Sequence, residues 1–370
     1  MRRTRGPGGA RERGAMTQSP GSAVPAFGSA APAGPAASSP SSPSSPDVAG
    51  RVPLGRSRRI LRAVAVASCL PYLSLKAAWI AGSRIGIPRG SSLLEHPTTM
   101  AVANSVTVLM DAAVIVLALV LTRPWGLRAP AWLLAVPVWV ATGLLAPIMA
   151  GFPLQLAARA LGGGGGHRTA REPFLDEWVF GVVYTGFIVQ GVALGTLFAL
   201  YARDRWGQLW RGPVWELPVS VVGAAQRCTA VAAGVLALFP LTVHLLWACG
   251  ATTGLSEGRV PERTGAFYAL EAVYVLFLLA AVTGAGLLAF RRGRPLPVTV
   301  PLALAWVGSG AAACWGAWLS VAALTAVDDP ADRATPLMLL TYAGQMITGF
   351  LVAAVAAHFL AERSTTGRAA

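Results

Sequence analysis

Charged residues are scarce in this sequence. Asp, Glu, Lys and Arg make up only 12% of the 370 residues, whereas hydrophobic residues make up 54%. A soluble domain normally carries roughly 25% charged residues, so the deficit argues against a water-soluble globular domain and indicates that lipid surrounds most of the chain. Basic residues outnumber acidic ones by 30 to 16. They fall mainly between apolar segments and in the N-terminal region, so we interpret them as charges that orient membrane helices and predict no nucleic-acid partner.

The motifs of common enzymes and metal proteins are also missing. The four cysteines form no CxxC pair, and the four histidines fall on different segments, which argues against a bis-histidine haem. The glycine run 162–166 is followed by His167 and Arg168, so it is no phosphate-binding loop. There is no HExxH motif and no nucleophile elbow. We therefore assign no catalytic, cofactor-binding or metal-binding residue and do not favour an enzyme; the cofactor stays unknown.

Eight apolar segments follow a polar N-terminal region. Each has close to the roughly 20 residues that a membrane-spanning helix needs. Backbone polar groups in lipid must be paired within their own segment, so these segments are expected to be helices. We predict an all-α polytopic membrane helical bundle with eight transmembrane helices. The expected spans are 63–82, 100–121, 131–150, 178–201, 230–249, 267–290, 301–324 and 337–360.

The regions between and around these segments divide the chain. Residues 1–58 are rich in Pro, Ser, Ala, Gly and Arg, which predicts a disordered cytoplasmic tail. Either Met1 or Met16 fits as the start of the protein. The other predicted parts are a first four-helix membrane repeat at 59–205, a cytoplasmic interfacial linker at 206–226, a second four-helix repeat at 227–363 and a C-terminal tail at 364–370.

Arginines near the segment ends predict the orientation. They concentrate before the first segment and in the 2–3, 4–5 and 6–7 connections, so both termini are expected in the cytoplasm. The 4–5 connection includes Arg203–Trp215, which contains Trp206, Trp210 and Arg211. We predict that this stretch lies against anionic lipids, in addition to the bilayer contact of the helices themselves.

The second half of the sequence resembles the first. At a shift of 168 residues the first apolar segment lies on the fifth, and at 167 Trp139–Gly143 lies on Trp306–Gly310. At 158 the fourth segment lies on the eighth, and the length change falls in the loop that holds the glycine run. Arg123, at the end of the second segment, also lies on Arg291 at a shift of 168. These four matches in order predict a parallel 4+4 tandem repeat. The matched pairs include Lys76 and His244, Trp79 and Trp247, Gly82 and Gly250, Gly86 and Gly254, Tyr184 and Tyr342.

Four ionisable residues are expected within the membrane. At a rise of about 1.5 Å per residue, Lys76, His244 and Glu271 fall in the outer half of their helices, and Asp111 falls near the middle. Such residues are costly in hydrocarbon, which makes each a functional candidate. Lys76 has three readings: an ion pair with Asp111 or Glu271, a side chain that reaches the interface, or a ligand- or proton-handling group.

Neutral polar residues inside the apolar segments complete the candidate site. For them, hydrogen bonding between helices competes with the lining of a cavity. The tryptophans matched by the repeat are interpreted as interfacial, and the paired glycines as helix-packing positions that compete with turns. The predicted polar membrane site consists of Lys76, Asp111, His244, Glu271, Tyr184, Tyr342, Gln190 and Gln345.

The first apolar segment carries the pattern Pro-Tyr-x-x-x-Lys-x-x-Trp-x-x-Gly from Pro71 to Gly82. This pattern resembles the first helix of uncharacterised multi-pass integral membrane proteins of high-GC bacteria. The resemblance covers about one helix and implies a protein of the bacterial inner membrane. It implies no activity.

Three functions are consistent with the sequence. The first is a transporter- or permease-like protein with a polar site between two pseudo-symmetric halves, which predicts a polar cavity. The second is a non-catalytic membrane assembly or sensor component, which predicts a tightly packed bundle. The third is an intramembrane enzyme, which requires that Lys76, Asp111, His244 and Glu271 converge.

Overall fold

The computed structural model of the protein describes residues 55–91, 94, 97–163, 175–210, 212, 223–292, 295–324 and 330–369. The chain divides into two units, Met1–Gly50 and Arg51–Ala370. The first unit lies outside the described residues, and so does the disorder predicted for residues 1–54. Arg56 and Arg58, which we expected in the tail, instead belong to the first turn of the first helix.

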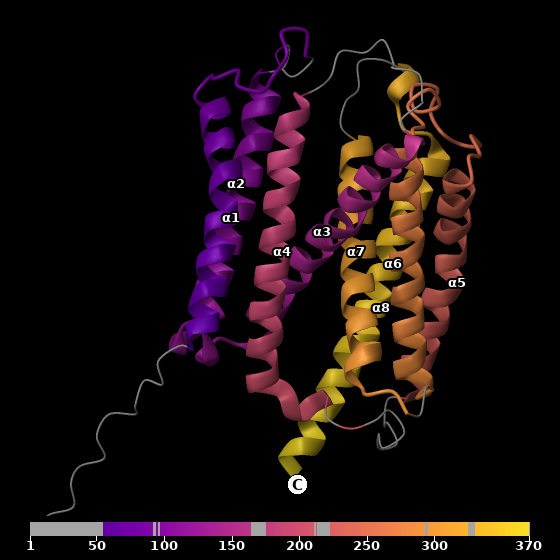
Figure 1. The fold of residues 1–370 in the computed structure, drawn as a ribbon. Helices are drawn as coiled ribbons and strands as arrows, with labels where there is room; N and C mark the ends of the chain where they lie inside the picture. Colours follow the sequence, from indigo (N-terminus) through magenta and orange to yellow (C-terminus); the bar gives the residue numbers. More distant parts are fainter. Residues whose placement is uncertain are drawn as a thin grey trace, which may run out of the picture. The chain divides into compact units, whose positions relative to one another are not determined.

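Within the described residues, eight helices are long and apolar enough to cross a membrane (Figure 1). The predicted class, an all-α polytopic membrane helical bundle, is confirmed. These helices are α1 (Arg56–Ile80), α2 (Pro97–Val120), α3 (Ala131–Ala158), α4 (Glu177–Trp206), α5 (Gly223–Ala248), α6 (Gly265–Phe290), α7 (Thr299–Leu324) and α8 (Pro336–Ala369). Short helical turns are η2 (Pro124–Arg128), η3 (Arg159–Gly163), η4 (Gly207–Trp210) and η6 (Pro330–Asp332).

Several helices extend beyond their expected spans. Helix α3 continues to Ala158 rather than residue 150, and α8 has 34 residues and reaches Ala369. The end of α8 carries polar side chains that no longer suit hydrocarbon, and Arg363 donates from Nε to the Leu209 carbonyl at 2.8 Å. Hydropathy marks the part of a helix within lipid, and a helix extends further wherever nothing stops it.

Close approach of backbones holds α6, α7 and α8 together. A methyl group on Gly284 or Gly308 would lie 2.4 Å from a backbone nitrogen across the α6–α7 contact. The same holds at 2.6 Å for Gly316 and at 2.4 Å for Gly349 across the α7–α8 contact. Small residues at helix contacts are the usual basis of packing in lipid, where no hydrophobic effect drives helices together. Helix α7 therefore lies at the centre of the second half.

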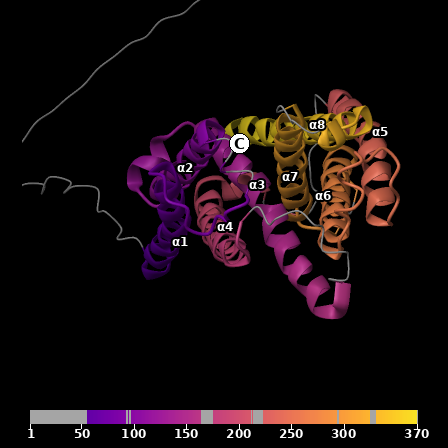
Figure 2. The same ribbon diagram turned by 90° about the horizontal axis from the view of Figure 1, so that it is seen from above.

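The first half packs differently. Helix α1 contacts α2 and α4, as α5 contacts α6 and α8. Helix α3, however, has little contact with α2 and instead packs against α7, α6 and α4. Seen from above, α3 lies between the α1–α2–α4 group and the α5–α8 group (Figure 2). The equivalent helix α7 packs mainly against α6 and α8 of its own half, so α3 is the element of the first half that joins it to the second.

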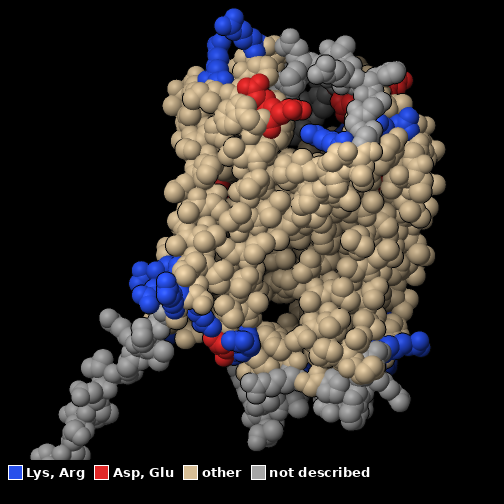
Figure 3. Space-filling view, in the orientation of Figure 1, with Lys and Arg blue, Asp and Glu red and all other residues tan. Residues whose placement is uncertain are grey.

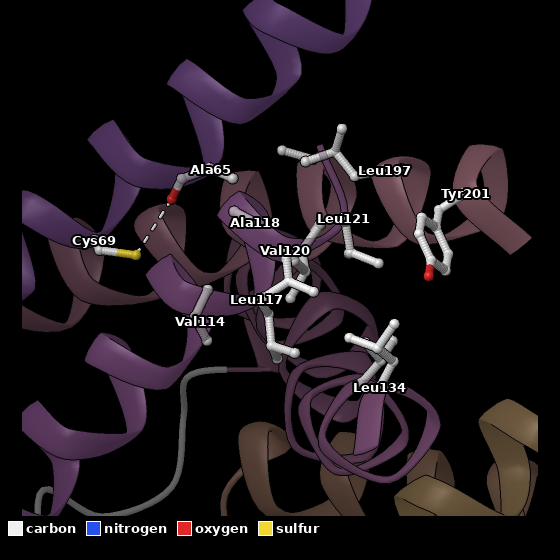
Figure 4. Packing of buried hydrophobic residues seen from close by; sticks show 13 residues of the cluster. Ala65, Cys69, Val114, Leu117, Ala118, Val120, Leu121, Leu134, Leu197 and Tyr201 are labelled. Carbon is white, nitrogen blue, oxygen red and sulfur yellow. Dashed lines mark hydrogen bonds between the residues drawn. The ribbon is translucent and has the colours of Figure 1, made fainter. Parts of the chain in front are cut away.

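An apolar cluster fills the α1–α2–α4 group and includes the start of α3. Leu117 on α2, Leu134 on α3, and Leu197 and Tyr201 on α4 point toward one another (Figure 4). Cys69 on α1 belongs to this cluster and donates from Sγ to the Ala65 carbonyl at 3.2 Å. This cysteine is a buried packing residue, as the sequence suggested.

The outer surface is apolar across the middle of the helices. Figure 3 shows Lys, Arg, Asp and Glu gathered toward the two ends, with a broad band of other residues between them. Large side chains such as Leu109, Val235 and Leu340 are each more than 60% exposed. A contiguous exposed apolar surface of this kind suits a bilayer as its solvent. We call the end where α1 begins and α8 ends the base of the bundle, and the opposite end the top.

Candidate polar sites in the membrane-spanning helices

Three of the predicted residues form one hydrogen-bonded cluster in the second half. His244 on α5 places Nδ1 2.6 Å from Oε2 of Glu271 on α6, and Nε2 2.9 Å from Oε1 of Gln345 on α8. The exposed fractions are 0% for His244, 1% for Gln345 and 7% for Glu271. The three side chains therefore form a buried hydrogen-bonded group that joins α5, α6 and α8. We call them the His244 cluster.

The geometry of the His244 cluster provides a partner for both nitrogens of the ring. Nδ1 faces the Glu271 carboxyl group and Nε2 faces the Gln345 amide group. At 2.6 Å, a hydrogen lies between Nδ1 and the Glu271 carboxyl group. This hydrogen bond offsets part of the cost of burying two ionisable groups in apolar surroundings.

Aromatic side chains enclose the cluster. The Tyr274 ring lies 5.1 Å from the His244 ring, and the Trp247 ring lies 5.6 Å away at 84°. Tyr342 is 7% exposed and packs beside Trp247. The Tyr274 hydroxyl is buried and forms no hydrogen bond with any described residue. A buried hydroxyl without a partner is unfavourable, so this group is a free donor and acceptor next to the cluster.

Tight turns at the ends of α1 and α5 position the first residues of both sites. Gly82 and Gly250 follow the helices with φ of 88° and 96°, a region that favours glycine. The indole nitrogens of Trp79 and Trp247 each donate to the carbonyl six residues further on, at 2.7 Å and 3.0 Å. Trp79 is 4% exposed and Trp247 is 1% exposed. The interpretation of these tryptophans as interfacial was therefore wrong: both are buried, and their hydrogen bonds hold the turns in place.

Lys76 occupies the matching position in the first half. Its Nζ atom donates to Oδ1 of Asn104 on α2 at 2.7 Å and lies 4.9 Å from the ring centroids of both Tyr72 and Trp79. Contact with two aromatic faces partly replaces the hydration of the ammonium group. Lys76 thus contacts Asn104, not the expected carboxylates. Glu271 instead pairs with His244.

Asp111 is the least satisfied of the candidates. It is 4% exposed, and its Oδ1 atom accepts from Gln190 Nε2 on α4 at 3.5 Å, the outer limit of a hydrogen bond. The second carboxylate oxygen, Oδ2, has no partner among the described residues, and neither has Gln190 Oε1. Asn104 Nδ2, beside Lys76, is also without one. The first half therefore contains several buried polar atoms that form no hydrogen bond with any described residue.

The eight predicted site residues do not form a single site. His244, Glu271 and Gln345 converge in the second half, and Asp111 and Gln190 meet in the first. The Tyr184 ring packs against aromatic rings, including Phe152 at 5.0 Å. The four ionisable residues are divided between α1–α2 and α5–α6, so the convergence that an intramembrane enzyme requires is not found. These two hydrogen-bonded groups lie inside one half each, whereas the halves meet in other polar contacts, such as Trp139 Nε1 to Ser309 Oγ at 3.0 Å.

Two functional candidates were missed by the sequence analysis. Asn104 and Tyr274 are neutral polar residues in apolar helices, where such residues are common and carry no distinctive pattern. One signal was available for Asn104, because it lies one position after Ala103, the residue that the repeat matches to Glu271. A search for polar residues near matched positions, rather than at them, would have identified it.

The fold and its sites define a polytopic helical membrane protein with buried polar groups in each half. Among the described residues, no group of three or more His, Cys, Asp and Glu side chains is placed to hold a metal ion. No protein-family model, curated protein or solved structure matches this chain.

Proposed function

We propose that this protein is a transporter- or permease-like carrier of the bacterial inner membrane, with both termini in the cytoplasm. The single observation that carries the proposal is the buried His244–Glu271 pair, in which Nδ1 and Oε2 lie 2.6 Å apart inside an apolar bundle. Ionisable residues at such depth are costly and mark ion or solute pathways in many membrane proteins. The His244 cluster and the Lys76–Asp111 region would be the polar groups that meet the cargo.

A proton can leave the His244 cluster only if water reaches it. His244 is fully buried, so the described conformation is closed to water at this position. Opening toward one side would let water exchange protons with the pair, and the free Tyr274 hydroxyl offers a further hydrogen bond to an entering water or solute. The proposed cycle therefore alternates between this closed state and states open to either side.

The contact between α3 and α7 supports the tandem repeat on which such a cycle depends. Gly143 and Gly310, matched by the repeat, lie against each other, because a methyl group on Gly143 would fall 2.3 Å from the Gly310 carbonyl oxygen. In a two-fold arrangement, equivalent residues contact each other where the axis passes. A small, smooth contact at the axis is suited to one half rocking against the other.

Cysteine accessibility tests the cycle without knowledge of the cargo. All four native cysteines are first replaced by serine, and Gln345→Cys and Val352→Cys are made separately. Both positions are on α8, two helical turns apart, and the native side chains are 1% and 0% exposed. A membrane-impermeant thiol reagent is then applied to cells and to inverted vesicles.

A carrier predicts labelling at position 345 and protection at position 352, because only the polar site opens to water. Protection of both positions from both sides would favour the packed assembly or sensor component instead, for which full burial of His244 is the supporting observation. Equal labelling of both positions would indicate a loosened bundle and would also count against the carrier.

A further inference from the structure

A surface cavity lies at the base of the bundle, beside the turn that joins α2 to α3. Its volume is about 430 Å³, and its lining consists of Arg123, Pro124, Trp125 and Arg128. All four belong to η2 or to the residue just before it. The cavity is separate from the buried polar groups and owes nothing to the proposed transport function.

Hydrogen bonds from side chains of α4 hold the turn in place. Tyr201 donates from its hydroxyl to the Gly126 carbonyl at 2.9 Å, and Arg205 donates from Nη2 to the Ala129 carbonyl at 2.6 Å. Gly126 packs so closely that a methyl group there would lie 2.0 Å from the Val120 carbonyl oxygen. The cavity is therefore preformed, and a ligand would not have to order the loop.

The two arginines of the cavity are not engaged by the protein. Both are exposed, and neither guanidinium group forms a hydrogen bond or ion pair within the part of the chain that the structure describes. Nearby arginines behave differently: Arg58 pairs with Asp204, and Arg205 supports the turn. Two free guanidinium groups on one cavity suit a phosphate, whose oxygens accept paired hydrogen bonds from such groups.

The surroundings of the cavity place it at the depth of lipid headgroups. Trp125 and Leu127 are each 54% exposed, and Trp132, at the start of α3, is 67% exposed. Exposed tryptophans at the end of a membrane-spanning helix lie at the boundary between hydrocarbon and headgroups. The phosphate nearest to the two arginines is then that of a phospholipid, with its acyl chains along the apolar side of α2 and α3.

We propose that the Arg123–Arg128 turn binds the phosphate of an anionic phospholipid. This location differs from the predicted lipid segment Arg203–Trp215. In the described part of that segment, Arg205 directs its guanidinium into the turn and Arg203 lies 3.7 Å from Asp204. Helix α4 therefore supports the turn through hydrogen bonds, and the η2 turn carries the arginines that would bind the phosphate.

The test uses the full-length protein in a neutral detergent and native mass spectrometry. Phosphatidylglycerol, phosphatidylcholine and inorganic phosphate are titrated separately. The test variant is Arg123→Gln/Arg128→Gln, and the matched control is Arg84→Gln/Arg89→Gln, which removes the same charge from two exposed arginines at the top of the bundle. A third variant, Trp125→Ala, separates lipid from free anion.

Phosphatidylglycerol is expected to bind wild type more tightly than phosphatidylcholine, and the test variant should lose about tenfold or more in affinity, since both charge-assisted hydrogen-bond donors to the phosphate are removed. The control variant should bind as wild type does. Equal binding of the two lipids, or an equal loss in the control, would overturn the proposal. Binding of inorganic phosphate that depends on the arginines and not on Trp125 would reassign the cavity to a free anion, which also overturns the lipid assignment.

Discussion

The Nδ1 atom of His244 lies 2.6 Å from the Oε2 atom of Glu271, on adjacent helices of the second half. The histidine side chain has no water-accessible surface. Neither residue has an alternative charged partner among the described residues of α5, α6 and α8. Because each buried ionisable group depends on the other, single and double substitutions are expected to have different effects on the free energy of unfolding.

Removal of one partner should destabilise the protein strongly. Glu271→Leu or His244→Leu leaves a buried group unpaired, and we expect each to lower the free energy of unfolding by about 3–5 kcal/mol. The double variant should cost much less than the sum, because an apolar pair replaces a desolvated one. Unfolding of the purified protein in mixed micelles measures all three. Additive effects would show that the two side chains do not act as a pair.

The contact between α3 and α7 gives a second prediction. Because a methyl group on Gly143 would overlap backbone atoms of Gly310, Gly143→Ala should force the helices apart and cost about 1–3 kcal/mol. Gly195 on α4 is the matched control, since a methyl group there meets nothing within 4 Å. Gly195→Ala should leave the unfolding midpoint unchanged or raise it, through helix propensity. Thermal unfolding of both variants decides, and an equal loss in both would contradict the close contact.

The helix spans could be predicted because bilayer thickness limits the length of each apolar segment, and hydropathy identifies those segments in the sequence. The arrangement of α3 could not, since its packing against α7 depends on small residues whose partners are set only when all the helices are assembled. The sequence placed His244 and Glu271 at similar depths, but depth alone does not tell which helix faces meet. For Lys76, an ion pair with a carboxylate was one of three readings, and the structure instead supplies Asn104, because that side chain faces α1.

The turns after α1 and α5, to which Trp79 and Trp247 donate hydrogen bonds, provide a test of equivalence between the halves. Trp79→Phe and Trp247→Phe each remove one buried indole hydrogen bond and leave an aromatic ring in place. Each is expected to cost about 0.5–1.5 kcal/mol, plus the effect of leaving a carbonyl unpaired. Similar shifts in the unfolding midpoint are expected for the two variants. A loss in one half and none in the other would argue against the structural equivalence that the repeat predicts.

Asp111 leads to the opposite expectation, a substitution that stabilises. Its Oδ2 atom is buried without a partner, and its contact with Gln190 is long, so the carboxylate is unfavourable where it lies. Asp111→Asn removes the charge, keeps the shape and adds a donor toward the free Oε1 atom of Gln190. We expect the free energy of unfolding to rise by about 1–2 kcal/mol. Gln190→Leu is the companion variant, and it should abolish the gain in combination with Asp111→Asn, because the new donor then has no acceptor. A natural sequence that keeps a destabilising carboxylate in the membrane does so for a reason other than folding. Measured destabilisation by Asp111→Asn would show instead that the carboxylate is well paired, and would remove it from the candidate site.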